Sequence, residues 1–488
     1  MTKILSKSKL MRGIQCEKSF WYSIHKPELE AEISEATQKL FDEGNAIGEK
    51  AREFGGPGVL IEGEYWDFTG THAKTQEAIK AGAKTIYEAS FLTHNFYARA
   101  DILKKVKSDW HLIEVKKATS VKDYYIEDAA IQTMIIEGSG PKLKTISIRF
   151  VNNEMVFPDF ENLFATEDIT EQVRDSISEI QKKVKKFQKF VSQKEEPKIT
   201  IGPHCADPFD CSFKDHCWKK VPEKSVFDLP QMTGKKKWEL FEAGKKKITD
   251  LDPKDYKGLV QRAVEVTKSK KLFTDPKKIA TALADWKWPL YFFDFETINP
   301  AMPRYKGTSP YSQVPFQFSC HVWDKAESKK LSHFEYLHTD ATDPRPLIIK
   351  SMLDGLGKKG SIVAYNKSFE IGVIKKLAEF DKKNREALLT LCERFVDPLP
   401  VIRESVYHPE FLGSFSIKHV APALIGKKVS YAGLSVADGS DAQIAAEQVI
   451  LGKVTGKARD ELIQDMLEYC RQDTLAMVEI VKWLMKAC

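Results

Sequence analysis

The sequence lacks any uninterrupted run of about 18 apolar residues, the length that a membrane-spanning helix needs. Its first residues also lack the apolar core of a secretory signal peptide. Internal repeats and low-complexity segments are missing as well. The sequence therefore predicts a cytoplasmic protein with no membrane partner.

The composition is that of a globular chain, with 42% hydrophobic and 30% charged residues. At 488 residues the chain is too long for one hydrophobic core, so two or three domains are expected. The formal net charge is +6, and lysines gather at 182–186, 235–237, 245–247 and 268–271. Each lysine cluster alone is typical of a solvated helix face, but together they favour a polyphosphate ligand.

Cysteine pairs separated by only two to four residues, which zinc sites usually contain, are missing. Structural disulfides are not expected among the eight cysteines of a cytosolic chain. Cys205, Cys211 and Cys217 are instead evenly spaced, and Cys16 lies near the start of the chain. Four such thiolates, drawn from the two ends of one domain, can bind zinc or a [4Fe–4S] cluster.

Residues 291–297 predict a buried strand in which aromatic residues are interrupted by two acids. Strand side chains alternate between faces, so Asp294 and Glu296 point the same way. Two adjacent carboxylates on an apolar strand are costly unless a cation lies between them, and a divalent metal ion suits their oxygen atoms. The alternative is a strand end at the surface, with both acids in water.

Further acids follow in the same half of the chain. A second strand is predicted at 361–365, and Glu370 lies at the start of the helix that follows it. Tyr469 and Asp473 are four residues apart and therefore share one face of the last helix. Together with Asp294 and Glu296, these residues form the donor set of a two-metal site that hydrolyses phosphodiesters.

The ordered motifs DFE (Asp294, Glu296), NxxFE (ending at Glu370) and YxxxD (Tyr469, Asp473) resemble the DEDD exonuclease superfamily. The resemblance covers residues 288–488 and implies a ribonuclease H-like fold, Mg²⁺ or Mn²⁺ as cofactor, and 3′–5′ exonuclease activity. In the tyrosine subtype, which this chain resembles, the tyrosine orients the attacking water. The second motif usually ends in Asp, so Glu370 changes the reach of that ligand by one methylene.

Two residues after the acidic strand are candidates for contact with a terminal nucleotide. Tyr311 is placed to stack on a base and Gln317 to form a hydrogen bond with it, since stacking on aromatic side chains tolerates any base. The alternative for this stretch is packing in the core of the next strand.

The N-terminal half predicts a mixed α/β core with strands at 84–89, 95–102, 111–116 and 145–151, and a helix at 125–137. Glu114 and Lys116 alternate with apolar residues and therefore share one strand face, and Asp101 precedes them by the length of a hairpin. Two carboxylates can bind Mg²⁺, and a lysine can orient water and stabilise charge on the phosphate. The alternative is an exposed charged strand.

These residues, with the four cysteines, resemble the iron–sulfur nucleases of the PD-(D/E)xK superfamily, of the AddB and CRISPR-adaptation type. The resemblance covers residues 8–220. It implies that Cys16, Cys205, Cys211 and Cys217 bind a [4Fe–4S] cluster that staples the two ends of the domain together. It also assigns Glu88 as an upstream acid and Gln132 as a helix-borne glutamine. These families usually carry a metal-binding His in an early helix, where this chain has Gly48.

The sequence thus predicts an α/β protein built from three parts. Residues 1–220 form a restriction-endonuclease-like PD-(D/E)xK domain with an Fe–S staple, 221–287 a basic helical linker, and 288–488 a ribonuclease H-like exonuclease domain. The expected activity is metal-dependent hydrolysis of DNA, in repair, recombination or defence. The alternatives are an RNA 3′–5′ exonuclease and a nucleic-acid-binding scaffold with a degenerate N-terminal nuclease.

Overall fold

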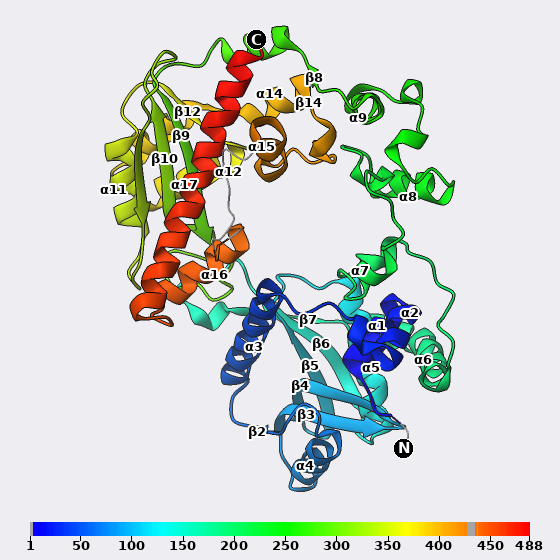
Figure 1. Cartoon of the computed structure of the whole chain (residues 1–488). Helices are drawn as coiled ribbons and strands as arrows, with labels where there is room; N and C mark the ends of the chain where they lie inside the picture. Colours follow the sequence, from blue (N-terminus) through cyan, green and yellow to red (C-terminus); the bar gives the residue numbers. More distant parts are fainter. Residues whose placement is uncertain (1–2, 427–434, 437) are drawn as a thin grey trace. The chain divides into compact units, whose positions relative to one another are not determined.

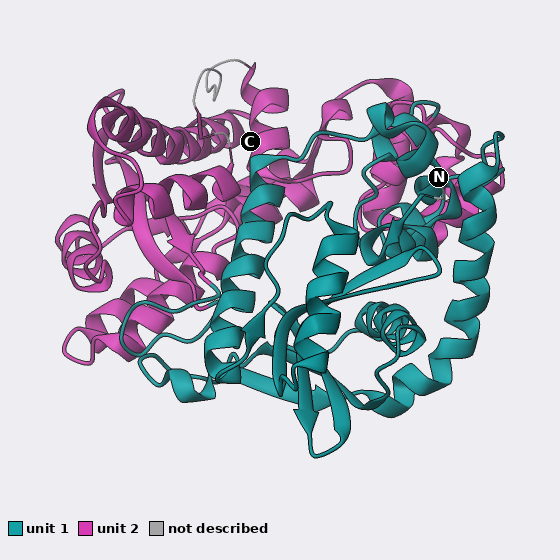
Figure 2. Cartoon of the chain, turned by 90° about the horizontal axis from the view of Figure 1, so that it is seen from below, with its two compact units in different colours: residues 1–220, 301–311 teal, residues 221–300, 312–488 magenta. Residues whose placement is uncertain are grey.

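The computed structural model describes residues 3–426, 435–436 and 438–488. The chain is a mixed α/β protein with several sheets (Figure 1). It divides into two compact units, shown in different colours in Figure 2. The first unit comprises residues 1–220 and 301–311, and the second comprises residues 221–300 and 312–488.

The first unit is built on a sheet in the order β2-β3-β4-β5-β6-β7, with β1 paired in parallel to β4. Its strands are β1 (Leu5–Ser6), β2 (Val59–Leu60), β3 (Thr85–Thr93), β4 (Phe96–Val106), β5 (Asp109–Lys116), β6 (Leu143–Val151) and β7 (Phe164–Asp168). Strands β3, β4 and β5 are antiparallel neighbours, whereas β5 and β6 are parallel. The parallel pair is joined by a helix, as a crossover of this kind requires.

The helices of the first unit are α1 (Lys7–Gln15), α2 (Glu17–His25), α3 (Glu35–Gly55), α4 (Phe68–Lys80), α5 (Asp123–Gly138), α6 (Thr170–Ser192) and α7 (Lys214–Cys217). Helix α6 buries Val173, Ile180, Val184 and Phe187, which recur at helical spacing. These residues pack in one hydrophobic core with α1, α2, α5 and the sheet. The start of the chain is therefore fixed beside α5 and the central strands.

The second unit contains a sheet in the order β11-β10-β9-β12-β13, with β9 in the centre. Its strands are β8 (Phe273–Thr274), β9 (Leu290–Ile298), β10 (Val314–Trp323), β11 (Ser332–Leu337), β12 (Ser361–Val363), β13 (Phe395–Val396) and β14 (Val406–Tyr407). Strands β11, β10 and β9 are antiparallel, and β12 and β13 continue parallel to β9.

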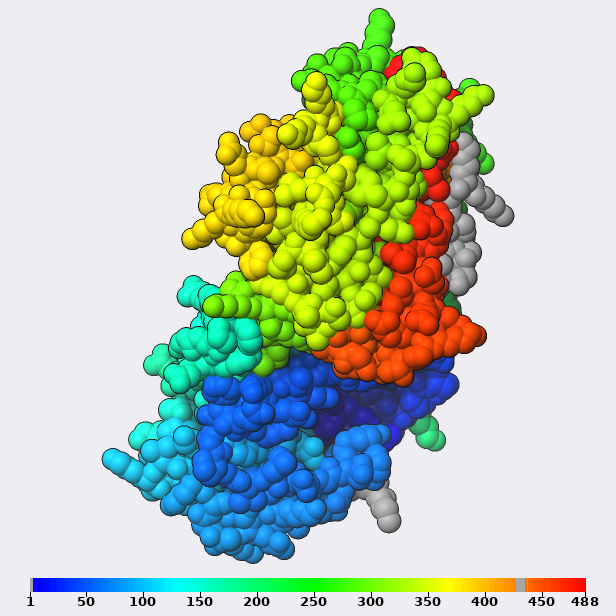
Figure 3. Space-filling model, turned by 90° about the vertical axis from the view of Figure 1, so that its left-hand side faces the viewer, coloured from blue at the N-terminus to red at the C-terminus, as the bar shows by residue number. Residues whose placement is uncertain are grey.

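Both faces of this sheet are covered by helices. The helices of the second unit are α8 (Gly234–Glu242), α9 (Gly258–Ser269), α10 (Pro276–Leu283), α11 (Arg345–Gly355), α12 (Ser368–Phe380), α13 (Arg385–Cys392), α14 (Pro398–Ser405), α15 (Ile417–Ile425), α16 (Gly439–Ile450) and α17 (Gly456–Lys486). Phe293 and Phe295 of β9 pack with α11, α12 and α13, whereas Phe292 packs with Met477 and Val481 of α17. In Figure 3 the outer surface of α11 and α12 is yellow-green to yellow, and α17 is red beside it.

Residues 221–287, predicted as a basic helical linker, contribute α8, α9 and α10 to the second unit. Val264 and Ile279 from this segment share a hydrophobic core with Phe411 and Ile480. Strand β8 of the same segment pairs with β14. The segment is therefore part of a packed core. Across the described residues, no helix combines the length and apolar character needed to cross a lipid bilayer.

Candidate functional site

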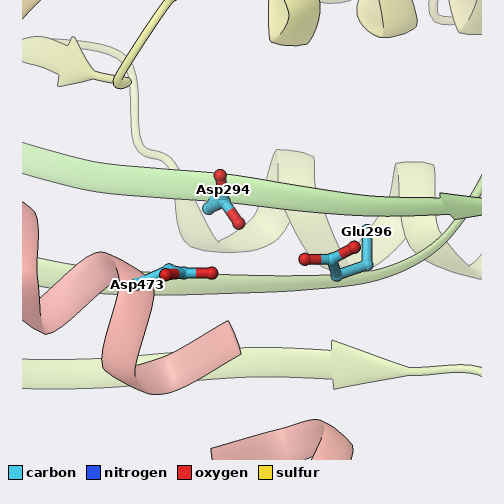
Figure 4. A group of neighbouring side chains, drawn as sticks. All are labelled: Asp294, Glu296 and Asp473. Atoms are coloured by element: carbon cyan, nitrogen blue, oxygen red, sulfur yellow. The ribbon is translucent and has the colours of Figure 1, made fainter. Parts of the chain in front are cut away.

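Three carboxylates meet on the α17 side of β9. Asp294 and Glu296 point to that side because strand residues two apart share a face. Asp473, on α17, completes the group, and one oxygen from each of the three acids lies within 4.8 Å of the others (Figure 4). Within the described ranges this is the one set of three or more His, Cys, Asp or Glu side chains that is so closely grouped.

Glu370 and Tyr469 line the same cavity, which has a volume of about 370 Å³. Glu370 lies in the first turn of α12 and is only 2% exposed. Its Oε2 atom is buried and receives no hydrogen bond from the described residues. Tyr469 lies one helical turn before Asp473 on α17, and the ammonium of Lys418 lies 5.4 Å from the centre of its ring. The cavity thus gathers the four acids and the tyrosine that the sequence motifs single out.

The acids of this cavity destabilise one another's charge. Burial raises the pKa of Asp294 well above its ordinary value, and the charges of Asp473, Glu296 and Glu370 add to this effect. The pKa of Glu296 is likewise raised by burial and by Asp473, although Lys418 opposes the shift. Burial raises the pKa of Glu370 to about 8. A divalent cation relieves such repulsion, and oxygen atoms are the ligands that Mg²⁺ and Mn²⁺ accept. The donor set and the orphaned Glu370 oxygen therefore fit a divalent metal site.

Neighbouring polar residues have structural partners instead. Asp397 caps α14 by accepting the backbone N–H of Leu399 at 2.8 Å, and it also accepts the N–H groups of Asn366 and Lys367. These three bonds occupy its oxygens and fix the turn that precedes α12. The position of this turn determines where Glu370 enters the cavity.

The two residues predicted to contact a nucleotide lie outside this cavity. Gln317 is fully buried in β10, and its amide nitrogen donates to the carbonyl oxygen of Met466 at 2.8 Å. Tyr311 belongs to the first unit, where its hydroxyl donates to the carbonyl oxygen of Lys117. The structure therefore gives both residues a packing role and leaves neither a surface beside Asp294.

The four cysteines of the first unit come from α1–α2 and from the segment 203–217. Cys16 joins α1 to α2, and the backbone N–H of Cys211 donates to the carbonyl of Cys205 at 2.9 Å. Burial raises the pKa of Cys217 to about 11, and the charges of the other three thiols act on it as well. All four are free thiols. The thiols of these four cysteines, from the two ends of residues 1–220, therefore lie near one another.

Their grouping can be compared with what each of the two cofactors left open by the sequence requires. A single zinc ion with Zn–S bonds of about 2.3 Å holds its four sulfurs roughly 3.8 Å apart. No three cysteine sulfurs among the described residues lie within 4.8 Å of one another. An iron–sulfur cluster binds each cysteine through a different iron atom and therefore needs a wider set of thiols. The four thiols are therefore not drawn together as a closed zinc site would hold them.

The first unit has an acidic group of its own, around Glu114 and Lys116, and lysines neutralise it. The ammonium of Lys116 donates to Glu114 Oε1 at 2.9 Å and to Asp128 Oδ2 of α5 at 2.6 Å. The ammonium of Lys7, the first residue of α1, donates to the same Glu114 oxygen at 2.9 Å and lies 3.0 Å from Asp128 Oδ1. The sequence argument missed Lys7 and Asp128. The available signal was that Asp128 lies one turn before Gln132 on the predicted helix.

Asp101 and Glu88 lie beside this group and line a cavity of about 540 Å³. Tyr87 pairs with Ile102 and Ala89 with Ala100, which leaves Glu88 opposite Asp101 and outside the ladder, with φ of +55°. Asp101 accepts the backbone N–H of Val115 at 2.6 Å. Glu88 forms an ion pair with Arg52 at 2.9 Å. Both acids therefore already have protein partners.

The remaining predicted residues of the first unit lie in different settings. Gln132 is fully buried on α5, so it has no surface to offer a substrate. Gly48 lines the cavity of Asp101, and a Cβ added there meets nothing within 4 Å. The position thus has room for a side chain but supplies no ligand.

The pKa values of this group follow its ion pairs. Burial alone lowers the pKa of Lys116, but Asp128 and Glu114 raise it well above its ordinary value. The pKa of Lys7 is raised for the same reason. Burial alone raises the pKa of Glu114, but Lys116 and Lys7 lower it below its ordinary value. All three groups are therefore charged at neutral pH.

The comparisons with known proteins match part of the chain. Residues 291–416 match the model of a family described as "Domain of unknown function (DUF2779)". "Uncharacterized protein UU173" of Ureaplasma parvum is 27% identical over 220 residues, or 40% of this chain and 31% of that protein. "Uncharacterized protein MG366" of Mycoplasma genitalium is 26% identical over 243 residues, or 45% of this chain and 36% of that protein. The match thus spans about a third of the length of these relatives.

Proposed function

We propose that the protein is a metal-dependent nuclease that hydrolyses DNA from the 3′ end at the acidic cavity of the second unit. The observation that carries this proposal is the grouping of Asp294, Glu296 and Asp473 within 4.8 Å, beside the buried Glu370. The order and directions of the strands around β9 are compatible with the ribonuclease H-like fold that the motifs imply. RNA is the alternative substrate, since enzymes of the superfamily that the motifs resemble act on both polymers.

The roles of the side chains follow from their places in the cavity. Asp294, Glu296, Glu370 and Asp473 are the metal ligands. A divalent ion held by these carboxylates would supply activation of water and stabilisation of the charge that develops on the phosphate. Tyr469 lines the same cavity, and its hydroxyl orients the attacking water. Burial excludes bulk water and strengthens each of these electrostatic interactions.

A second cavity supports a polymeric substrate. It has a volume of about 590 Å³ and shares Tyr365 and Asn366 with the acidic cavity. Its lining includes Arg403 and Phe415, with the guanidinium carbon 5.9 Å from the centre of the ring. A cation beside an aromatic face can bind a phosphate and stack a base of the same strand. The nucleotides preceding the scissile bond fit in this second cavity.

In this proposal the role of the first unit follows from its cysteines and its lysines. Its four cysteines bind a [4Fe–4S] cluster, which ties α1–α2 to the segment 203–217. The lysine-rich helix α6, with residues 182–186, is a surface for the DNA backbone.

The direct test uses the full-length protein, Mn²⁺ and one DNA strand labelled at either end. A 3′-labelled strand should release a labelled mononucleotide at once, whereas a 5′-labelled strand should shorten progressively. The same pair of RNA strands tests the alternative substrate. Mononucleotides released first from the 5′ end, or hydrolysis that persists in EDTA, would rule the proposal out.

The second cavity is tested by chain length. Arg403→Ala should raise KM for an oligonucleotide about tenfold, the effect of losing one charge-assisted contact. It should not change hydrolysis of bis-p-nitrophenyl phosphate, which is too small to reach that cavity. Lys382→Ala, an exposed lysine away from both cavities, is the control. An equal loss on both substrates would show that Arg403 supports the metal site instead.

A further inference from the structure

Lys7 occupies a position that is unusual for the first residue of a surface helix. Its ammonium is 2.9 Å from Glu114 and 3.0 Å from Asp128, and only 22% of its side chain is exposed. Lys116, at the end of β5, contacts the same two carboxylates at 2.9 and 2.6 Å. Two ammonium groups therefore bridge two carboxylates. Lys7 and Glu114 are 107 residues apart in the sequence.

The charges of this cluster balance, since Lys7 and Lys116 match Glu114 and Asp128 one for one. A divalent ion binds where several carboxylates leave negative charge uncompensated. Glu114 Oε2 has no hydrogen bond from the described residues, so it is the one oxygen of that carboxylate still open to a cation. An ion there would lie beside two ammonium groups bound to the other oxygen, and their repulsion opposes binding.

Neither neighbouring acid brings two free oxygens to the site. One oxygen of Asp101 accepts the N–H of Val115, and Glu88 is paired with Arg52. Gly48 lines the same cavity and has no side chain to act as a ligand. None of these groups lies in a set of three metal-binding side chains within 4.8 Å, as judged over the described part of the chain. The residues of this site therefore do not fit the divalent ion that the PD-(D/E)xK resemblance implies.

We infer that the ammonium of Lys7 takes the place of a divalent metal ion in the first unit, so that this site holds no catalytic metal and does not cut DNA. The cluster of Lys7, Lys116, Glu114 and Asp128 instead ties α1 and α5 to β5. Hydrolysis therefore belongs to the second unit alone.

The experiment removes the cation and asks whether a metal site appears. The background is the full-length protein with Asp294→Asn and Asp473→Asn, which disables the acidic cavity of the second unit. Binding is followed by the loss of the free Mn²⁺ electron paramagnetic resonance signal during titration. The background should show no Mn²⁺ binding in the first unit. Adding Lys7→Met should create one site, with Mn²⁺ affinity at least about tenfold higher, because an opposing charge is lost.

Lys9→Met is the matched control, because Lys9 lies on the same helix and contacts none of the four residues. It should leave the background without a site. Lys7→Gln provides a second variant if the methionine variant unfolds, and Mn²⁺ should raise its Tm but not that of the background. One Mn²⁺ bound by the background and lost with Asp101→Asn would overturn the inference. A folded Lys7→Met or Lys7→Gln protein that binds no Mn²⁺ would overturn it as well.

Discussion

The two acidic sites of this chain use similar side chains but differ in what neutralises them. In the second unit, Asp294, Glu296 and Asp473 lie together, and burial with mutual repulsion raises the pKa of Asp294 well above its ordinary value. In the first unit, Glu114 is also buried, yet the ammonium groups of Lys116 and Lys7 overcome the effect of burial and lower its pKa. The carboxylates of Glu114 and Asp128 thus have ammonium partners, whereas burial and mutual repulsion dominate at Asp294 and Glu296.

This difference shows that buried carboxylates alone do not identify a metal site. The cost of burying a charge is offset by whichever cation is present, and a lysine serves as well as a metal ion. What distinguishes the two cases is the charge left over after the protein's own ion pairs are counted. On the proposal made above, the acids of the second unit need an ion from solution, whereas Glu114 and Asp128 of the first unit are paired with lysines of the chain itself.

The largest expected effect is on hydrolysis. Asp294→Asn in the full-length protein should reduce nuclease activity about 10³-fold or more, because losing a metal ion removes several kcal/mol of transition-state stabilisation. The assay covers single- and double-stranded DNA and RNA, with Mg²⁺ and with Mn²⁺. Residual hydrolysis that a further Glu114→Gln change removes would show that the first unit also cuts, and the contrast between the two sites would fail.

A second contrast concerns what each unit needs for folding. Cys211→Ser should lose iron and destabilise the first unit, because a bound structural metal contributes folding free energy. Iron content and absorbance of anaerobically purified protein are the measurements, and Cys392→Ser in the second unit is the control. EDTA should stop hydrolysis in the second unit without unfolding it. Protein that contains stoichiometric zinc and no iron would contradict the cluster while leaving a four-thiol site.

The signs of two stability changes should be opposite. In EDTA, Lys7→Met should lower the free energy of unfolding by about 3 kcal/mol, because breaking a buried ion pair leaves a carboxylate uncompensated. Asp294→Asn should raise it, because it removes one of several repelling charges. Urea unfolding of each variant against wild type gives both values, with Lys9→Met as the control. A loss of stability in both variants would show that the second unit is balanced by cations as well.

The site in the second unit follows largely from local sequence pattern. Asp294 and Glu296 share a face because strands alternate, and Tyr469 and Asp473 share a face because four residues complete about one helical turn. Glu370 lies in the first turn of the helix that follows a short buried strand. Local pattern thus places each pair on one face, but the packing of α12 and α17 against β9, which brings the pairs together, was implied only by the motif resemblance.

The cases that the sequence did not predict depend on distant packing. Lys7 reaches Glu114 from 107 residues away, because α1 packs beside α5 in the first core. Gln317 alternates with apolar residues as a functional strand residue would, but both faces of β10 are covered, and the side chain is fully buried. Local pattern does not reveal which faces a neighbouring element covers. For this reason the sequence missed Lys7, and it predicted a nucleotide contact for Gln317, which is buried.

The smallest expected effect is the part of the pH dependence of stability that comes from Glu370 in the second unit. Burial raises the pKa of Glu370 to about 8 in the folded protein, above its ordinary value. A group with a raised folded pKa contributes full stability below its unfolded pKa and loses that contribution as pH rises through the folded pKa. Metal-free protein should therefore become less stable from about pH 5 to pH 8 and level off above that range.

Glu370→Gln isolates this contribution, because glutamine keeps the shape of the side chain and cannot ionise. Measured by calorimetry in EDTA, the variant should match wild type near pH 5 and melt at a higher temperature at pH 8 to 9. Mn²⁺ should reverse the order at pH 8, since only the carboxylate of wild type gains from a bound cation. An identical pH profile for the two proteins in EDTA would mean that Glu370 already has a compensating cation, and that the second site is balanced in the same way as the first.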